Sequence, residues 1–170
     1  FLNGNCSKIL GGYDFCGNSG PCDSVNYDSD PYDDEGHGTH VAGIAVANGN
    51  IKGVAPDANL IVIKALNASG IGDSSDIAKG IEYCVNNASL YNISVISMSL
   101  GWVLYNSYCN DDYLASFIDA AVAKNITVVA AAGNSGSKTN ISSPACIENV
   151  SAVGWSNEED AIDSNSNRNN

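Results

Sequence analysis

The chain has few basic residues and no long apolar run, and these absences bear on two classes of function. Seven Lys and Arg stand against 19 Asp and Glu, for a formal net charge of −12 over 170 residues. We therefore expect no nucleic-acid partner, because phosphate binding needs a basic face. No apolar stretch approaches the roughly 20 residues of a transmembrane helix, so we expect no membrane segment in this chain. The acidity is more simply explained as serving solubility.

The six cysteines include no Cys-x-x-Cys pair of the kind that holds a metal, and their even number permits a set of disulfides. Cys16 and Cys22 could close a small loop, and Cys6 could pair with either one. Cys84 lies in a helical stretch and could instead be a small buried apolar residue. Sequons of the form Asn-x-Ser/Thr are compatible with an exported glycoprotein, and they occur at Asn5, Asn67, Asn87, Asn92, Asn125, Asn140 and Asn149.

A histidine between two glycines stands directly before an apolar segment. After His37, residues 41–47 have almost no polar side chain, which predicts a helix over 38–48 that is buried all round. The positive end of a helix favours the neutral imidazole, the form that can accept a proton. Taken alone, His37 and His40 could be half of a zinc site, and a lone buried histidine is more often structural.

The rest of the chain alternates apolar strands with helices. Strands are expected over 8–12, 60–65, 93–99, 127–131 and 150–153, and helices over 38–48, 73–86 and 114–122. This order predicts an α/β fold of three layers, a doubly wound, mostly parallel sheet with helices on both faces. Ligands of such sheets collect beyond the carboxyl ends of the strands. A nucleotide-binding domain is the less favoured alternative, because no Gly-x-Gly-x-x-Gly or phosphate loop is present.

Two of the strands end in loops of small residues, at Ser-Met-Ser-Leu-Gly (97–101) and Ala-Ala-Ala-Gly-Asn-Ser-Gly (130–136). Together with the His37 motif, Gly-Val-Ala-Pro (53–56), the strand 61–66 and Gly-Ile-Glu-Tyr (80–83), they occur in a specific order. On these blocks the chain resembles the subtilisin-like serine proteases from about Lys8 to Val153.

The resemblance implies two catalytic residues. His37 would take the proton of a serine hydroxyl and return it to the leaving amine. Asn134 would donate its side-chain amide to the oxyanion formed during acyl transfer; its alternative is an ordinary Gly-Asn turn after a strand. His40, one helical turn beyond His37, is expected to be a packed structural residue.

The resemblance also implies a substrate cleft for extended peptides. Its residues would be Ser99, Leu100, Gly101, Ala131, Ala132, Gly133 and Pro144. Ser99 would not be the nucleophile, and a strand-terminating serine explains its hydroxyl equally well. The peptide bond before Pro144 could be cis. Cys109 and Cys146 fall in the two loops that border the pocket in the family, and we expect them to bond to each other.

Two motifs of the family do not occur, the upstream Asp-Ser/Thr-Gly and the downstream Gly-Thr-Ser-Met-Ala. Residues 8–15 resemble the strand after the Asp segment. Residues 161–168 resemble the segment before the Ser region, although Asn165 stands where the family usually has an aromatic residue. We therefore expect residues 1–170 to be a partial peptidase domain, truncated at both ends, that neither hydrolyses peptides nor folds robustly alone.

No cofactor and no metal ligand is assigned. Many relatives carry structural calcium, and oxygen ligands are available at Asp23, Asp28, Asp30, Asp33 and Asp34. However, the stretch 43–53 is shorter than in relatives that hold calcium after this helix, so solvated loop carboxylates are the favoured interpretation.

The sequence thus predicts an extracellular serine endopeptidase that acts on peptide or protein substrates, with an inhibitory propeptide as a further candidate partner. The main alternative is an inactive relative that uses the cleft only to bind peptides.

Overall fold

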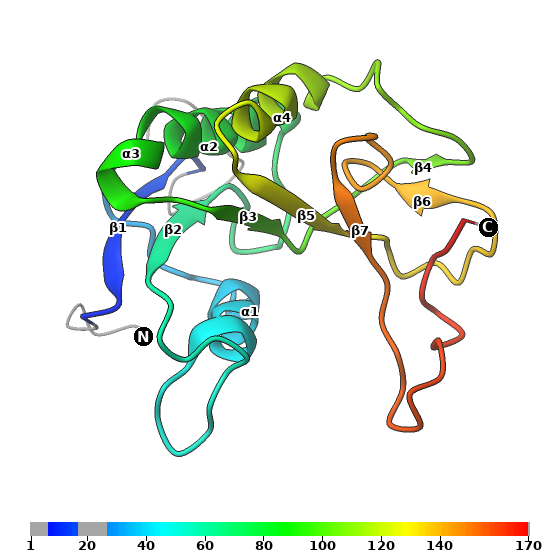
Figure 1. The fold of residues 1–170 in the computed structure, drawn as a ribbon, viewed down its shortest axis with the longest axis horizontal. Helices are drawn as coiled ribbons and strands as arrows, with labels where there is room; N and C mark the ends of the chain where they lie inside the picture. Colours follow the sequence, from blue (N-terminus) through cyan, green and yellow to red (C-terminus); the bar gives the residue numbers. More distant parts are fainter. Residues whose placement is uncertain (1–6, 17–26, 170) are drawn as a thin grey trace. The chain divides into compact units, whose positions relative to one another are not determined.

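The computed structural model describes residues 7–16 and 27–169, and it divides into two units, Phe1–Gly80 and Ile81–Asn170. Each unit is described by itself (Figure 1). The helix α2 (Ser74–Asn86) spans the boundary between them. The cysteine alternatives that involve Cys6 and Cys22 fall outside the described residues.

In the first unit, β1 (Ile9–Asp14) pairs in parallel with β2 (Leu60–Lys64). Helix α1 (His37–Val46) follows the acidic loop after β1. Lys8, just before β1, donates from Nζ to the carbonyl of Val46 at 2.8 Å, and a cation is favourable at the last turn of a helix. The described interior of this unit includes Phe15, Cys16, Val46, Ile77 and Ala78.

Asp73 stands directly before the first residue of α2. Asp73 accepts a hydrogen bond from the backbone N–H of Ser75 at 2.8 Å, as an N-cap side chain does. The helical spacing places Ile77, Ile81, Cys84 and Val85 on one apolar face, and the first three are buried while Val85 is half-buried. Cys84 is a free cysteine, as the sequence allowed.

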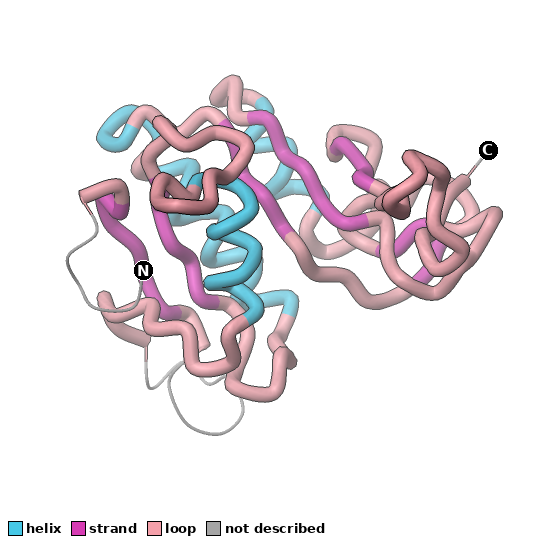
Figure 2. Tube along the Cα trace, turned by 90° about the horizontal axis from the view of Figure 1, so that it is seen from below, coloured by secondary structure: helices cyan, strands magenta, loops and turns pink. Residues whose placement is uncertain are grey.

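The second unit is built on a parallel sheet in the order β3 (Val95–Met98), β5 (Thr127–Ala131), β7 (Ser151–Val153). Helix α3 (Ala88–Tyr91) precedes β3, and α4 (Ala115–Val122) lies alongside β5 (Figure 1). The fully buried side chains between α4 and this sheet include Leu114, Ile118, Ile126 and Val128. Beyond β7 the chain runs mainly as loop to the C terminus (Figure 2).

A short antiparallel pair, β4 (Leu104–Tyr105) with β6 (Ile141–Ser142), was not expected from the sequence. Two-residue strands carry too little alternation to be recognised. The parallel sheets with intervening helices confirm the predicted α/β class. Among the described helices, none is both long and apolar enough to cross a membrane.

Candidate active site

His37 is the first residue of α1, and the backbone around it is held by two carboxylates. Gly36 occupies the N-cap position with φ +102°, a left-handed conformation that favours glycine. The N–H of His37 donates to the carboxylate of Glu35 at 2.7 Å. The side chain of His37 is exposed, so its imidazole is accessible to a reacting group.

Asp33 caps the helix from outside it. Its carboxylate accepts from the backbone N–H groups of Gly36 at 2.8 Å, Thr39 at 2.6 Å and Glu35 at 3.2 Å. Partial burial by itself raises the pKa of Asp33. The hydrogen bonds from the Thr39 side chain and from these N–H groups outweigh burial, and they lower the pKa to about 2. The carboxylate therefore stays charged at the positive end of α1.

A buried lysine ties the same loop to the sheet of the first unit. Lys64 Nζ, at the end of β2, lies 3.2 Å from Asp14 Oδ2 and 3.3 Å from Asp34 Oδ2. The Asp14 side chain is fully buried and that of Lys64 is 7% exposed. Residues 60–65 were expected to form an apolar strand, and the buried lysine at its end was not predicted. The signal for it is a lone cation at the end of an apolar run, which when buried requires a carboxylate partner.

Two predictions for this region are wrong. Helix α1 is not buried all round: only Val46 is buried, and Ile44 is 58% exposed. Uniform apolarity predicts full burial only where elements pack on every side. In the described residues, the chain that follows α1 contacts mainly the last turn of this helix, where the backbone N–H groups of residues 53–55 donate hydrogen bonds to carbonyl groups of residues 44–47. For the same reason His40 is exposed rather than packed.

The predicted substrate residues of the second unit lie on loops at the carboxyl ends of its strands. Ser99, Leu100 and Gly101 follow β3, and they are exposed or half-buried. Beside them, Trp102 N–H donates to the Ser143 carbonyl at 3.1 Å, and Gly101 lies close against Ser143. The structure thus brings the loop after β3 next to the segment that contains Pro144.

Ala131 is the last residue of β5, and Ala132 and Gly133 follow it. The N–H of Ser142 donates to the Ala132 carbonyl at 2.9 Å, which joins the second small-residue loop to the same segment. Pro144 is buried and follows a cis peptide bond, as the sequence allowed. The two small-residue loops, 99–101 and 131–133, therefore both contact the segment 142–144 that contains Pro144.

The predicted bond between Cys109 and Cys146 is present, with the two Cα atoms 5.4 Å apart. Nearby, Asn110 and Glu148 exchange two hydrogen bonds of 3.0 Å. These contacts fix the chain just after Pro144 to the loop that precedes α4. Cys16 is disulfide-bonded as well.

Asn134 follows Gly133 on the exposed surface of the second unit. Gly133 has φ +106°, so the chain turns sharply between the end of β5 and Asn134. The loop that carries Asn134 rests on Asn167, which is 2% exposed. Residues 161–168 were expected only as the segment before the Ser region, and Asn167 was not predicted to be buried, because a polar residue in a polar segment gives no sign of its burial.

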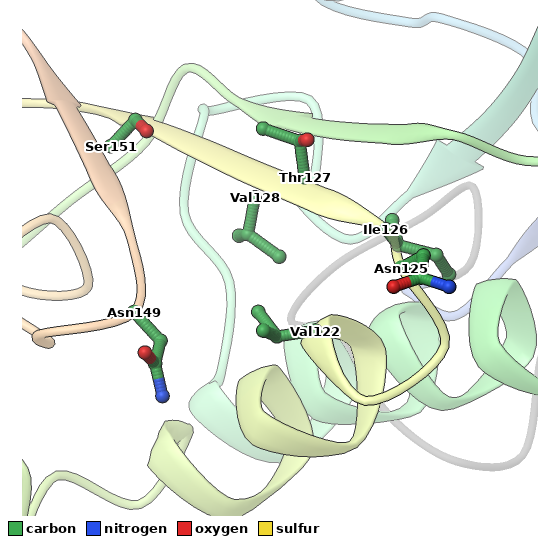
Figure 3. Close-up of a pocket in the computed structure, with 7 residues that line it drawn as sticks. All are labelled: Val122, Asn125, Ile126, Thr127, Val128, Asn149 and Ser151. Carbon is green, nitrogen blue, oxygen red and sulfur yellow. The ribbon is translucent and has the colours of Figure 1, made fainter.

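A separate hollow lies at the opposite end of the strands (Figure 3). It is lined by Val122, Asn125, Ile126, Thr127, Val128, Asn149 and Ser151. Thr127 and Ser151 are the first residues of β5 and β7, so the hollow is at their amino ends. It contains none of the predicted site residues.

The acidic loop contacts protein groups rather than gathering round a common point. Asp28 accepts from the N–H of Asp30 at 2.7 Å, whereas Asp33 caps α1 and Asp34 contacts Lys64. Within residues 7–16 and 27–169, no three His, Cys, Asp or Glu side chains are grouped to hold a metal ion. Asp23 lies outside these ranges.

Comparison with known proteins agrees with these motifs. Residues 12–170 match the family model described as the subtilase family. The thermophilic serine proteinase of Bacillus sp. (strain AK1) is 40% identical over 164 residues, covering 94% of this chain and 36% of that protein. Subtilisin DY of Bacillus licheniformis is 41% identical over 167 residues, covering 95% and 52%.

Among solved structures, sphericase superposes with a TM-score of 0.73 at 37% identity, covering 92% of this chain and 51% of sphericase. The fold is therefore subtilisin-like. The chain spans between about a third and a half of the length of these relatives. With the match over residues 12–170, the chain belongs to the subtilase family.

Proposed function

We propose that the complete protein is a serine endopeptidase and that this chain supplies two of its catalytic groups, His37 as general base and Asn134 as oxyanion donor. The observation that carries the proposal is the subtilase match over residues 12–170, which includes both residues. Their settings support it. His37 is exposed at the first turn of α1, and Asn134 is exposed just beyond the carboxyl end of β5.

In this mechanism His37 accepts the proton of a serine hydroxyl as the hydroxyl oxygen bonds to the scissile carbonyl carbon. The carbonyl oxygen becomes an oxyanion, and the Asn134 amide donates a hydrogen bond to it. His37 then gives the proton to the leaving amine, and water releases the acyl group by the same steps. The serine and the aspartate that orients His37 would lie outside these 170 residues, because neither family motif occurs in them.

The substrate would be an extended peptide or protein segment. Ser99–Gly101 would pair with its backbone as an added strand, and Ala131–Gly133 would leave room for a side chain beside Pro144. The protein would be exported, since a disulfide such as Cys109–Cys146 persists in oxidising compartments.

The test compares the complete protein with its His37→Ala and His40→Ala variants on casein and on a panel of peptide p-nitroanilides. His40 is the matched control, because it is an exposed histidine on the same helix. In subtilisin, itself a member of this family, loss of the catalytic histidine lowers kcat by about 10⁶-fold. We expect a loss of that order for His37→Ala and little change for His40→Ala. Equal activities of the two variants would contradict the role of His37.

A further inference from the structure

The amide of Asn167 bonds to the chain on both sides of Asn134. Its Oδ1 accepts from the backbone N–H groups of Ser135 and Ser137, each at 3.0 Å. Its Nδ2 donates to the carbonyl of Ala132 at 3.1 Å. With Asn167 only 2% exposed, water does not compete readily for these bonds.

The backbone around Asn167 holds the same loop. The contacts join 133–137 with 165–168 at 2.8 to 2.9 Å, through Gly136 N–H to Asn165 O, Asn167 N–H to Gly133 O, and Arg168 N–H to Ser137 O. The loop that carries Asn134 is therefore fastened before and after that residue, while the Asn134 side chain stays exposed.

The loop passes so close to the Asn167 amide that position 133 has no room for a side chain. A Cβ added to Gly133 would lie 2.3 Å from Nδ2 of Asn167 and 2.2 Å from Oγ of Ser142. Gly133 also has φ +106°. Because the backbone passes directly against the Asn167 amide, the place of that amide decides where the chain turns toward Asn134.

The contacts also require an amide rather than another polar group. Asparagine offers an oxygen with two lone pairs and an NH₂ donor, and here the oxygen receives two N–H groups while the nitrogen meets a carbonyl. A carboxylate would keep the acceptor but place its second oxygen against the Ala132 carbonyl. Alanine would leave the two backbone N–H groups without this acceptor.

We propose that Asn167 is a positioning residue for acyl transfer, which fixes residues 132–137 so that the Asn134 amide is aimed at the oxyanion. This inference rests on the proposed function of Asn134. Oxyanion donors act because they are held in place before charge develops. A misplacement on the order of 1 Å costs about 100-fold in rate. Asn167 itself touches neither substrate nor the reacting atoms in this proposal.

The test is a double-mutant cycle in the complete protein, with Asn167→Ala and Asn134→Ala alone and together. Rates are normalised to the sites that react with a fluorophosphonate, so that unfolded protein does not count. Asn169→Ala is the matched control, because Asn169 lies in the same segment but donates to Asn106 O at 3.1 Å, away from the Asn134 loop. Asn167→Ser is the milder variant, because serine removes less volume than alanine and replaces the amide by a hydroxyl that can still accept a hydrogen bond.

We expect Asn167→Ala to lower kcat roughly 10- to 100-fold with KM changed by less than about threefold. Asn167→Ser should lie between it and the wild type. With Asn134 already replaced by alanine, the same Asn167 substitutions should change kcat by less than about twofold, because no donor is left to aim.

An equal loss of kcat in both backgrounds would overturn the positioning role and leave Asn167 as a structural residue only. A change in KM with kcat unchanged would also overturn the positioning role. If Asn134→Ala alone left kcat unchanged in an active enzyme, the proposed role of Asn134 would fail, and this inference with it.

Discussion

Asp33→Asn should destabilise the protein near neutral pH, and the effect should shrink in acid. The Asp33 carboxylate accepts three backbone N–H groups, from Glu35, Gly36 and Thr39, and Gly36 at the N-cap has no side chain that could replace it. Its pKa is lowered from 3.8 to about 2. At about 1.4 kcal/mol per pKa unit, this shift corresponds to a stabilisation of roughly 2 kcal/mol, which we discount to about 1 to 2 kcal/mol for solvent screening.

The pH dependence follows from the sign of that shift. Because the folded-state pKa is the lower one, the contribution is fully present above pH 3.8 and is lost as the pH falls toward 2. Near pH 3, about half of this stabilising contribution should remain. The asparagine side chain of the variant does not titrate, so the difference in free energy of unfolding between wild type and Asp33→Asn should narrow over this range.

The assay is urea unfolding of the complete protein from pH 7 to pH 3, followed by circular dichroism. Asp57→Asn, at an exposed loop position, controls for the removal of one negative charge. A difference between wild type and Asp33→Asn that is the same at pH 7 and pH 3, or that Asp57→Asn reproduces, would refute the capping argument.

Three further predictions concern stability and reactivity. Replacing Cys109 and Cys146 together by alanine should cost about 2 to 4 kcal/mol, since the bond closes a loop with a sequence separation of 37; an unchanged melting temperature under oxidising conditions would contradict this. Burial raises the pKa of Cys84 to about 11, so its thiol should resist iodoacetamide at pH 8 until the protein is unfolded; mass spectrometry showing rapid alkylation of folded protein would argue against it. Lys64→Met removes the cation between the Asp14 and Asp34 carboxylates and should lower the free energy of unfolding, measured with denaturant, by roughly 3 kcal/mol or more. A variant as stable as the wild type would show that these two ion pairs add nothing to stability.

The regular part of the fold could be predicted from local pattern. Residues 127–131 were predicted as a strand and form β5, and the helix predicted over 73–86 is α2 with Asp73 at its cap. These elements combine strong apolar periodicity with a clear start signal, so local preference and tertiary packing agree.

The errors arise where burial depends on distant parts of the chain. The apolar helix α1 was expected to be buried, yet Ile44 is exposed, because burial needs partners that the helix sequence does not specify. Asn167 shows the converse, since its polar neighbours give no sign of the loop that encloses it. The pairing of Cys109 with Cys146 came from family resemblance and was confirmed, whereas spacing alone allowed other pairs.

Fluorophosphonate labelling of the complete protein tests the catalytic role of His37 most directly, because the probe reacts only with an activated serine. We expect the wild type and His40→Ala to be labelled at comparable rates and His37→Ala not to be labelled. Labelling of His37→Ala at the wild-type rate would contradict the role of His37. No labelling of folded, processed wild-type protein would contradict the proposed peptidase and favour a relative that only binds peptides.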